Sequence, residues 1–254
     1  MNVAPEERLA AAIARLIVDP AAPPARHVAV GAASPVPAAA CLLARALGHR
    51  LRISNLHAVR GNPFTEGCRE LFDLAGQGRI DLFFLGGGQI DGEANLNLIG
   101  TGAWPGTGPE GGVRFPGSFG SAFMYMVVPR TILFREEHSR RVLVPRVAQI
   151  SAPGVSPPGV FRRGTAQALV TGRCVFGFAG GRFRLASVHP GETAESVRAN
   201  TGFAYDEPQA VPITPDPSER ELALLRGPVH EAMAATYPGF CRRVWGRAAV
   251  GEAA

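Results

Sequence analysis

The chain contains no lysine, so all 26 of its basic side chains other than histidine are arginines. Against 21 acidic residues they leave a formal net charge of +5. A surplus of this size suits phosphate-bearing small molecules. The sequence nevertheless lacks the dense basic clusters with interleaved aromatic residues that mark nucleic-acid surfaces. The composition therefore argues against a nucleic-acid partner.

Long apolar runs are missing as well. No stretch reaches the length of about 18 apolar residues that a membrane-spanning helix needs. Near the N-terminus, charged side chains interrupt the apolar positions that a signal peptide would require, namely Glu6, Glu7, Arg8 and Arg15. These absences predict a protein that has no membrane association and stays in the cytoplasm.

The cysteines show no metal-binding pattern. None forms a C-x-x-C pair or has the spacing to a histidine that zinc sites show, and the four are Cys41, Cys68, Cys174 and Cys241. We therefore expect reduced, structural thiols, no metal site and no permanently bound cofactor.

The first third of the 254 residues alternates strand-like and helix-like patterns. Short apolar runs predict strands at 27–31, 51–54 and 80–85, and periodic apolar positions predict helices at 6–17, 34–48 and 65–75. Ser34 and Pro35 look like the N-cap and first residue of the second helix. Strand, loop and helix in this order are the unit of an open α/β sheet.

The later part of the chain predicts further strands and helices. Strand-like runs lie at 131–135, 147–150, 168–171, 174–178 and 183–188, and residues 122–128 fit a helix or a strand. A helix at 193–200 begins at a Thr193 cap. Another at 217–235 has a capping box from Ser218 to Glu221 and a break at Gly227-Pro228. Because no repeat or linker is visible, we expect one domain over residues 1–254.

The strand at 80–85 ends abruptly in Gly86-Gly87-Gly88. Three successive glycines allow the backbone to approach a ligand closely and to donate N–H groups to it. A wide turn between two strands explains the same residues equally well. Taken alone, the glycines leave both interpretations open.

Four motifs occur in one order along the chain: LGGGQIDGEANLN at 85–97, VRFPGS at 113–118, VTG with VFGF at 170–178, and SVHPGET with NTGF at 187–203. With these motifs the chain resembles the β subunit of family I CoA-transferases of the glutaconate CoA-transferase type, and the related β subunit of the hydrolase that opens a steroid ring as a CoA thioester. The resemblance implies an open, mostly parallel α/β sheet flanked by helices. It also implies an α-subunit partner and an acyl-CoA thioester as substrate.

The resemblance also assigns candidate site residues. The thioester or oxyanion loop would be Gly86, Gly87, Gly88 and Gln89, and the side chains that support it would be Asp91, Asn95 and Asn97. Contacts to CoA or substrate are expected from Arg60, Arg114, Gly117, Ser118 and Phe119. Ala94 stands where the family has glycine.

The family's glutamate nucleophile follows the second core strand, but residues 52–61 contain no carboxylate. His57 is a candidate substitute as a general base, and a loop histidine that faces solvent or caps a turn is the alternative. Glu66, Glu70 and Glu93 fit structural positions better, and so does His189. The missing glutamate favours a catalytic role other than CoA transfer. The chain would then be a subunit of a hydrolase, or of an enzyme that opens a ring or cleaves a C–C bond. A genuine acyl-CoA:carboxylate CoA-transferase and a non-catalytic scaffold are the alternatives.

Overall fold

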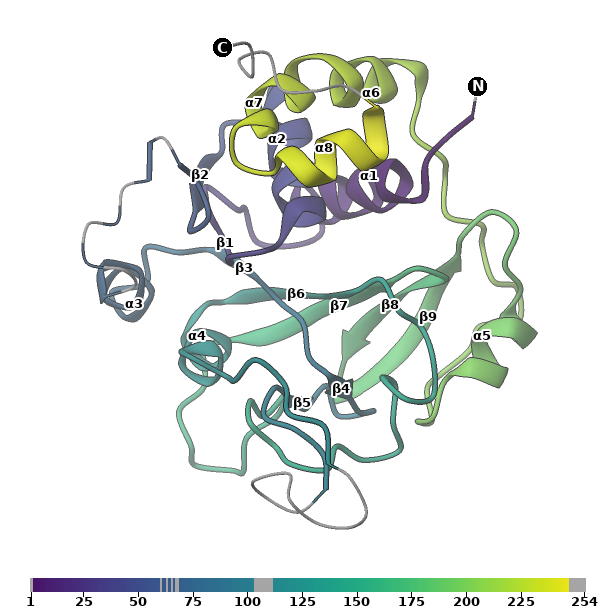
Figure 1. The fold of residues 1–254 in the computed structure, drawn as a ribbon. Helices are drawn as coiled ribbons and strands as arrows, with labels where there is room; N and C mark the ends of the chain where they lie inside the picture. The colour runs from purple at the N-terminus through teal and green to yellow at the C-terminus, as the bar shows by residue number, and fades with distance from the viewer. Residues whose placement is uncertain are drawn as a thin grey trace. The chain divides into compact units, whose positions relative to one another are not determined.

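The computed structural model describes residues 2–59, 61, 62, 64, 66, 69–102 and 112–246. Its contacts divide the chain into two compact units (Figure 1). Unit 1 comprises Met1–Phe84 and Pro215–Ala254, and unit 2 comprises Leu85–Thr214. The single domain expected from the sequence stays a prediction.

Unit 1 is built on three parallel strands in the order β2 (Arg52–Asn55), β1 (His27–Val30) and β3 (Leu82–Leu85). Val28 pairs with Ile53 on one side and with Leu82 on the other. Every residue of β1 and β3 is buried. This is why these strands read as continuous apolar runs, as expected for a parallel sheet covered on both faces.

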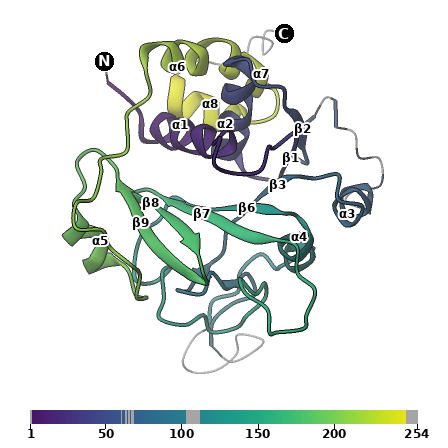
Figure 2. The same cartoon turned by 180° about the vertical axis from the view of Figure 1, so that it is seen from behind.

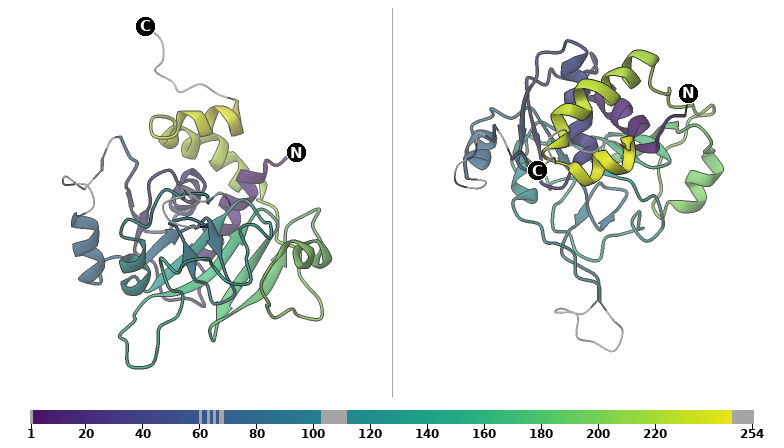
Figure 3. Two further views of the ribbon diagram at one scale, coloured as in Figure 1. Left: turned by 60° about the horizontal axis from the view of Figure 1, so that its bottom comes forward. Right: turned by 45° about the horizontal axis from the view of Figure 1, so that its top comes forward.

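The N- and C-terminal helices of unit 1 pack together, purple and yellow in Figure 3. They are α1 (Pro5–Ile17), α2 (Pro35–Ala46), α6 (Glu219–Leu224), η1 (Leu225–Val229), α7 (His230–Ala234) and α8 (Pro238–Trp245). Glu7, only 1% exposed, links the two ends of the chain. Its carboxylate accepts from Arg226 Nε at 2.6 Å and from Trp245 Nε1 at 3.1 Å. These contacts hold the C-terminal helix, which we did not predict, against α1.

The helix boundaries agree with the sequence prediction in part. Ser34 and Pro35 are the N-cap residue and the first residue of α2, as predicted, but the Ser34 hydroxyl donates to Ala32 O at 3.2 Å and makes no capping hydrogen bond. Helix α3 (Arg69–Gly76) begins later than expected, and part of the predicted helix lies outside the described residues. The capping box from Ser218 to Glu221 is confirmed, and so is the break in the last predicted helix at Gly227, whose φ and ψ are −109° and −106°.

Unit 2 contains β6 (Arg130–Arg135), β7 (Thr165–Thr171), β8 (Cys174–Ala179) and β9 (Arg182–Val188), with α4 (Ser121–Val127) and α5 (Ala194–Asn200) (Figure 2). β6 and β7 are parallel, whereas β7, β8 and β9 form antiparallel pairs. Phe176 and Phe183, both fully buried, pack with Phe203 at ring-centroid distances of 5.3 to 6.0 Å. Across the strands of the two units, β1–β2, β1–β3 and β6–β7 are parallel pairs, and β7–β8 and β8–β9 are antiparallel pairs. The predicted mostly parallel α/β class is confirmed.

The strand predicted at residues 147–150 is wrong. Val147 N donates to Asp91 Oδ2 at 3.3 Å and Ala148 N donates to Gln89 Oε1 at 2.9 Å. Side chains thus take the N–H groups that a neighbouring strand would need, and the segment is irregular despite its apolar sequence.

Within the described part of the chain, no helix is both long and apolar enough to cross a membrane.

Candidate functional site

The three glycines of the loop after β3 are required by close packing. A Cβ at Gly86 would lie 2.7 Å from Phe134 O, and one at Gly87 would lie 2.8 Å from Gln89 O. A Cβ at Gly88 would lie 2.3 Å from the Phe115 ring. Gly88 N also donates to Asn97 O at 2.9 Å. Close packing against other atoms of the chain therefore accounts for the glycines, and the oxyanion role of their N–H groups stays a prediction.

The loop continues into a two-stranded antiparallel hairpin of β4 (Gln89–Ile90) and β5 (Leu96–Asn97). Asp91, 3% exposed, organises the turn between them. Its Oδ1 accepts from Glu93 N and Asn95 N, each at 3.1 Å, and its Oδ2 accepts from Asn95 Nδ2 and Val147 N, each at 3.3 Å. The buried carboxylate is thus satisfied by four donors, and it connects the hairpin to residue 147.

The two asparagines attach further segments to the hairpin. Asn95 Oδ1 accepts from Gly154 N at 2.9 Å. Asn97, fully buried, donates to Gln89 Oε1 at 2.9 Å and to Gly100 O at 2.8 Å. The side chains of Asp91, Asn95 and Asn97 therefore fix the hairpin and the segments beside it, and their role in supporting a substrate-binding loop stays a prediction.

Ala94 lies in the turn of this hairpin with φ of +59°, a left-handed conformation that favours glycine. This explains why a glycine would suit the position. Its carbonyl accepts from the Tyr125 hydroxyl at 3.1 Å, and the Arg162 guanidinium lies 4.7 Å from the centre of the Tyr125 ring.

Beside the hairpin, unit 2 has a hollow of about 430 Å³. It is lined by Ile99, Arg114, Phe115, Gly117, Ser118 and Gln149. Three of the predicted substrate contacts, Arg114, Gly117 and Ser118, are thus brought together. Phe119 is 78% exposed with φ of +44° and is not part of this lining.

Gln149 was not predicted because it is distant in sequence from the other lining residues. Its position follows from Gln89, whose Oε1 accepts from Ala148 N. Gln89 therefore positions a wall of the hollow, and the same oxygen also accepts from Asn97 Nδ2. The hollow combines a cation, an amide, a hydroxyl and apolar surface, a mixture typical of small-molecule sites.

His57 lies in unit 1, just after β2. Its backbone N–H donates to Asn55 Oδ1 at 3.0 Å. Its exposed ring stacks on the Tyr237 ring, with centroids 5.1 Å apart and an interplanar angle of 16°. The Tyr237 hydroxyl donates to the same Asn55 oxygen at 3.1 Å. Tyr237 precedes the unpredicted helix α8, so no sequence pattern placed it here. Arg60 lies outside the described residues.

The carboxylates that the sequence analysis set aside as structural have local partners. Glu66 lies before α3 and forms an exposed pair with Arg69 at 2.9 Å. Glu93 Oε2 accepts from Asn95 Nδ2 at 3.2 Å within the hairpin turn. His189, 2% exposed, contacts Thr171 O through Nε2 at 2.9 Å, a structural position.

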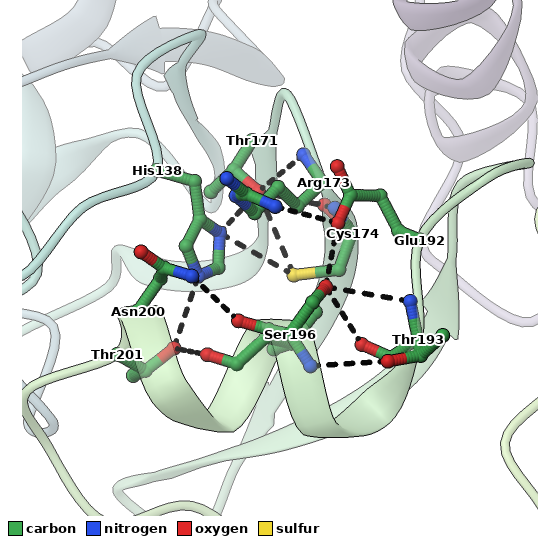
Figure 4. A network of polar contacts seen from close by, with 10 residues as sticks. His138, Thr171, Arg173, Cys174, Glu192, Thr193, Ser196, Asn200 and Thr201 are labelled. Carbon is green, nitrogen blue, oxygen red and sulfur yellow. Dashed lines mark hydrogen bonds and ion pairs between the residues drawn. The ribbon is translucent and has the colours of Figure 1, made fainter.

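A buried polar network lies elsewhere in unit 2 (Figure 4). His138 contacts Thr171 Oγ1 at 2.8 Å and Thr201 Oγ1 at 3.0 Å, and Cys174 Sγ lies 3.8 Å from His138 Nδ1. Burial raises the pKa of the Cys174 thiol to about 12 and lowers the pKa of His138 to about 4. A protonated thiol beside a neutral imidazole is not an activated nucleophile, so this pair is structural.

The buried histidine predicts a loss of stability in acid. Since burial lowers the pKa of folded His138 from 6.5 to about 4, protonation favours the unfolded chain. The contribution of neutral His138 to the free energy of unfolding is present above pH 6.5 and is lost as the pH falls toward 4. The loss is roughly 3 kcal/mol, at about 1.4 kcal/mol per pKa unit. Urea unfolding of the wild type and of His138→Gln across this range measures it. The variant should show a clearly smaller decrease, and an equal decrease in both proteins would contradict the assignment.

No protein-family model matches the chain. Over 157 residues, 59% of this chain, it is 33% identical to one of the subunits of the 3-oxoadipate CoA-transferase of Pseudomonas knackmussii, and it spans 58% of the length of that relative. Over 190 residues, 70% of this chain, it is 31% identical to the cholesterol ring-cleaving hydrolase IpdB subunit of Rhodococcus jostii, 72% of which is covered.

Solved structures are similar over most of the chain. The decarboxylase AibA/AibB matches with a TM-score of 0.74 and 25% identity, covering 97% of this chain and 100% of that one. IpdAB of Rhodococcus jostii RHA1 matches with a TM-score of 0.73 and 26% identity, covering 89% and 94%. Glutaconate coenzyme A-transferase from Acidaminococcus fermentans, at 21% identity and a TM-score of 0.73, shares the fold. The chain therefore belongs to the family I CoA-transferase β subunits, as its four sequence motifs predicted.

Proposed function

We propose that this chain is the β subunit of a heteromer that acts on an acyl-CoA thioester together with a CoA-transferase-like α subunit. The observation that carries the proposal is the hollow lined by Arg114, Phe115 and Ser118, which lies beside the glycine-rich hairpin. Its cation and hydroxyl suit a polar acyl group or a phosphate, and its apolar surface suits a carbon chain. The reaction would take place in the cytoplasm, with no cofactor beyond the CoA of the substrate.

The reaction class that we favour is hydrolysis, or ring opening with C–C cleavage. Residues 52–61 offer no carboxylate to form an anhydride with the acyl group, so this chain would not carry a glutamyl thioester. Two relatives have names that fit this class, a cholesterol ring-cleaving hydrolase subunit and a decarboxylase. In a hydrolysis, water would add to the thioester carbonyl and the C–S bond would break to release the thiol of CoA.

The proposed roles of the residues follow from their chemistry. Gly86, Gly87 and Gly88 would orient the thioester through their backbone, and Gln89 would hold the segment that carries Gln149. Arg114, Gly117, Ser118 and Phe119 would contact the substrate or CoA, and Arg60 would bind an anionic group. His57 would accept a proton, with Tyr237 and Asn55 fixing the orientation of its loop.

Acyl transfer between CoA and a carboxylate is the second candidate. It is favoured by the similarity to a 3-oxoadipate CoA-transferase subunit. In this case the partner subunit would have to supply the nucleophile.

The test is co-expression with an α-like partner, followed by assays with acyl-CoA donors and free-acid acceptors. Release of free CoA or of a ring-opened or decarboxylated product supports the favoured class. Acyl exchange without free CoA supports transfer, and a tight complex without any turnover supports a scaffold. His57→Ala should lower kcat, and Tyr237→Phe should lower it less because the ring stack is retained. Unchanged kcat in His57→Ala would remove His57 from the proposed chemistry.

A further inference from the structure

Arginines lie where each strand of the parallel sheet in unit 1 begins. Arg52 is the first residue of β2, Arg26 directly precedes β1, and Arg79 lies three residues before β3. Parallel neighbours start at the same edge of a sheet, so these positions are adjacent. The contacts agree, because Arg52 N donates to Arg26 O and His27 Nδ1 contacts Arg79 O, each at 2.8 Å.

A groove of about 280 Å³ runs along this edge. Its lining combines the arginines Arg26 and Arg50 with apolar residues, among them Val18, Pro20 and Pro24. One carboxylate, Asp19, also lines the groove, and its Oδ1 already accepts from Ala21 N at 2.9 Å. The groove thus combines positive charge with apolar surface.

Within the part of the chain that the structure describes, this edge carries four arginines against two carboxylates, Asp19 and Asp81. There, Arg26, Arg50, Arg52 and Arg79 have no ion-pair partner, whereas other arginines of the unit, Arg8, Arg15 and Arg226, each pair with a carboxylate. The nearby Asp81 uses Oδ2 to accept from the N–H groups of Arg26 and His27, each at 2.8 Å. An anion bound here would therefore meet an excess of positive charge from guanidinium groups that form no ion pair within the described chain.

We propose that this groove binds a small molecule that joins a diphosphate to an aromatic or apolar body, the chemistry of a nucleoside diphosphate. Guanidinium groups bind phosphate oxygens through paired N–H donors, which suits Arg26 and Arg50. The apolar lining residues, among them Val18, Pro20 and Pro24, would cover the base. The site lies at the amino ends of the strands, whereas Asn55 and His57 lie at and beyond the carboxyl end of β2. It is therefore separate from the proposed catalytic residues and does not depend on the proposed reaction.

Calorimetric titration of the full chain with ADP and with inorganic pyrophosphate, at about 0.15 M salt, tests this inference. Both should bind, and ADP should bind more tightly because pyrophosphate makes no use of the apolar lining residues. The double variant Arg26→Ala/Arg50→Ala should weaken both by at least about tenfold, since charge-assisted hydrogen bonds are among the stronger polar contacts. Arg220→Ala, which removes an exposed arginine elsewhere in unit 1, is the matched control and should bind like the wild type.

Each other outcome would overturn the proposal. Undetectable binding of both ligands by the wild type would show that there is no site. Equal weakening by Arg220→Ala and by the double variant would show non-specific attraction to net charge. Loss of ADP binding in Arg114→Ala, with normal binding in the double variant, would place the nucleotide in the hollow of unit 2. A circular dichroism spectrum and melting temperature like those of the wild type would confirm that each variant is folded.

Discussion

Replacing Asp91 by alanine is expected to lower the free energy of unfolding by at least about 3 kcal/mol, because a buried donor left without an acceptor costs about 1–3 kcal/mol. The carboxylate accepts from four N–H groups, of Glu93, Asn95 (backbone and side chain) and Val147. Without the carboxylate, the N–H groups in the turn between β4 and β5 and the backbone N–H of residue 147 lose their acceptor. Urea unfolding of purified protein measures the effect.

The controls separate the buried carboxylate from charge in general. Glu93→Ala removes a neighbouring, exposed carboxylate that accepts one hydrogen bond, from Asn95 Nδ2, and should cost less than about 1 kcal/mol. Asp91→Asn keeps one acceptor oxygen and should fall between the two. Equal stability of Asp91→Ala and Glu93→Ala would show that the hairpin does not depend on Asp91.

Gly88→Ala is expected to impair substrate binding more than any other single methyl group added to the loop. The new Cβ would lie 2.3 Å from the Phe115 ring, so the ring must move, and this ring lines the hollow. Overpacking of this kind costs about 1–3 kcal/mol. We expect KM for the acyl-CoA to rise about tenfold in the complex with the α subunit, because about 1.4 kcal/mol of lost binding corresponds to a factor of ten. Steady-state kinetics and urea unfolding measure the two effects.

Gly177→Ala is the matched control, because a Cβ there meets nothing within 4 Å and should leave KM and stability near wild type. Phe115→Leu, a smaller side chain, should relieve part of the clash. The double variant with Gly88→Ala should then be less impaired than the sum of the single changes. If Gly88→Ala kept a normal KM, the Phe115 ring would not belong to the substrate site.

The secondary structure was largely predictable from the sequence where local patterns decide it. The apolar runs of β1 and β3 and the capping residues Thr193 and Ser218 act within a few residues of themselves. The prediction of secondary structure failed where side chains that are distant in the sequence determine the backbone hydrogen bonds. Residues 147–150 have a strand-like sequence, but the side chains of Gln89 and Asp91 take their N–H groups.

The motif residues of the candidate site could be predicted from the sequence, whereas the residues that contact them from distant parts of the chain could not. The glycine loop, its supporting side chains and Arg114 to Ser118 follow from sequence similarity to the family. Gln149 and Tyr237 do not, because their positions depend on contacts across long sequence separations. A local sequence signal for helix α8 did exist, namely Pro238 at its start and Gly246 after its end.

The central claim is that this chain is a β subunit that takes part in acyl-CoA chemistry without forming a glutamyl thioester itself. The most direct test is borohydride treatment of the α/β complex during turnover of an acyl-CoA, followed by mass spectrometry of both subunits. We predict product formation with no reduced glutamate or aspartate on this chain. A reduced carboxylate on any residue of this chain, formed only in the presence of acyl-CoA, would contradict the account.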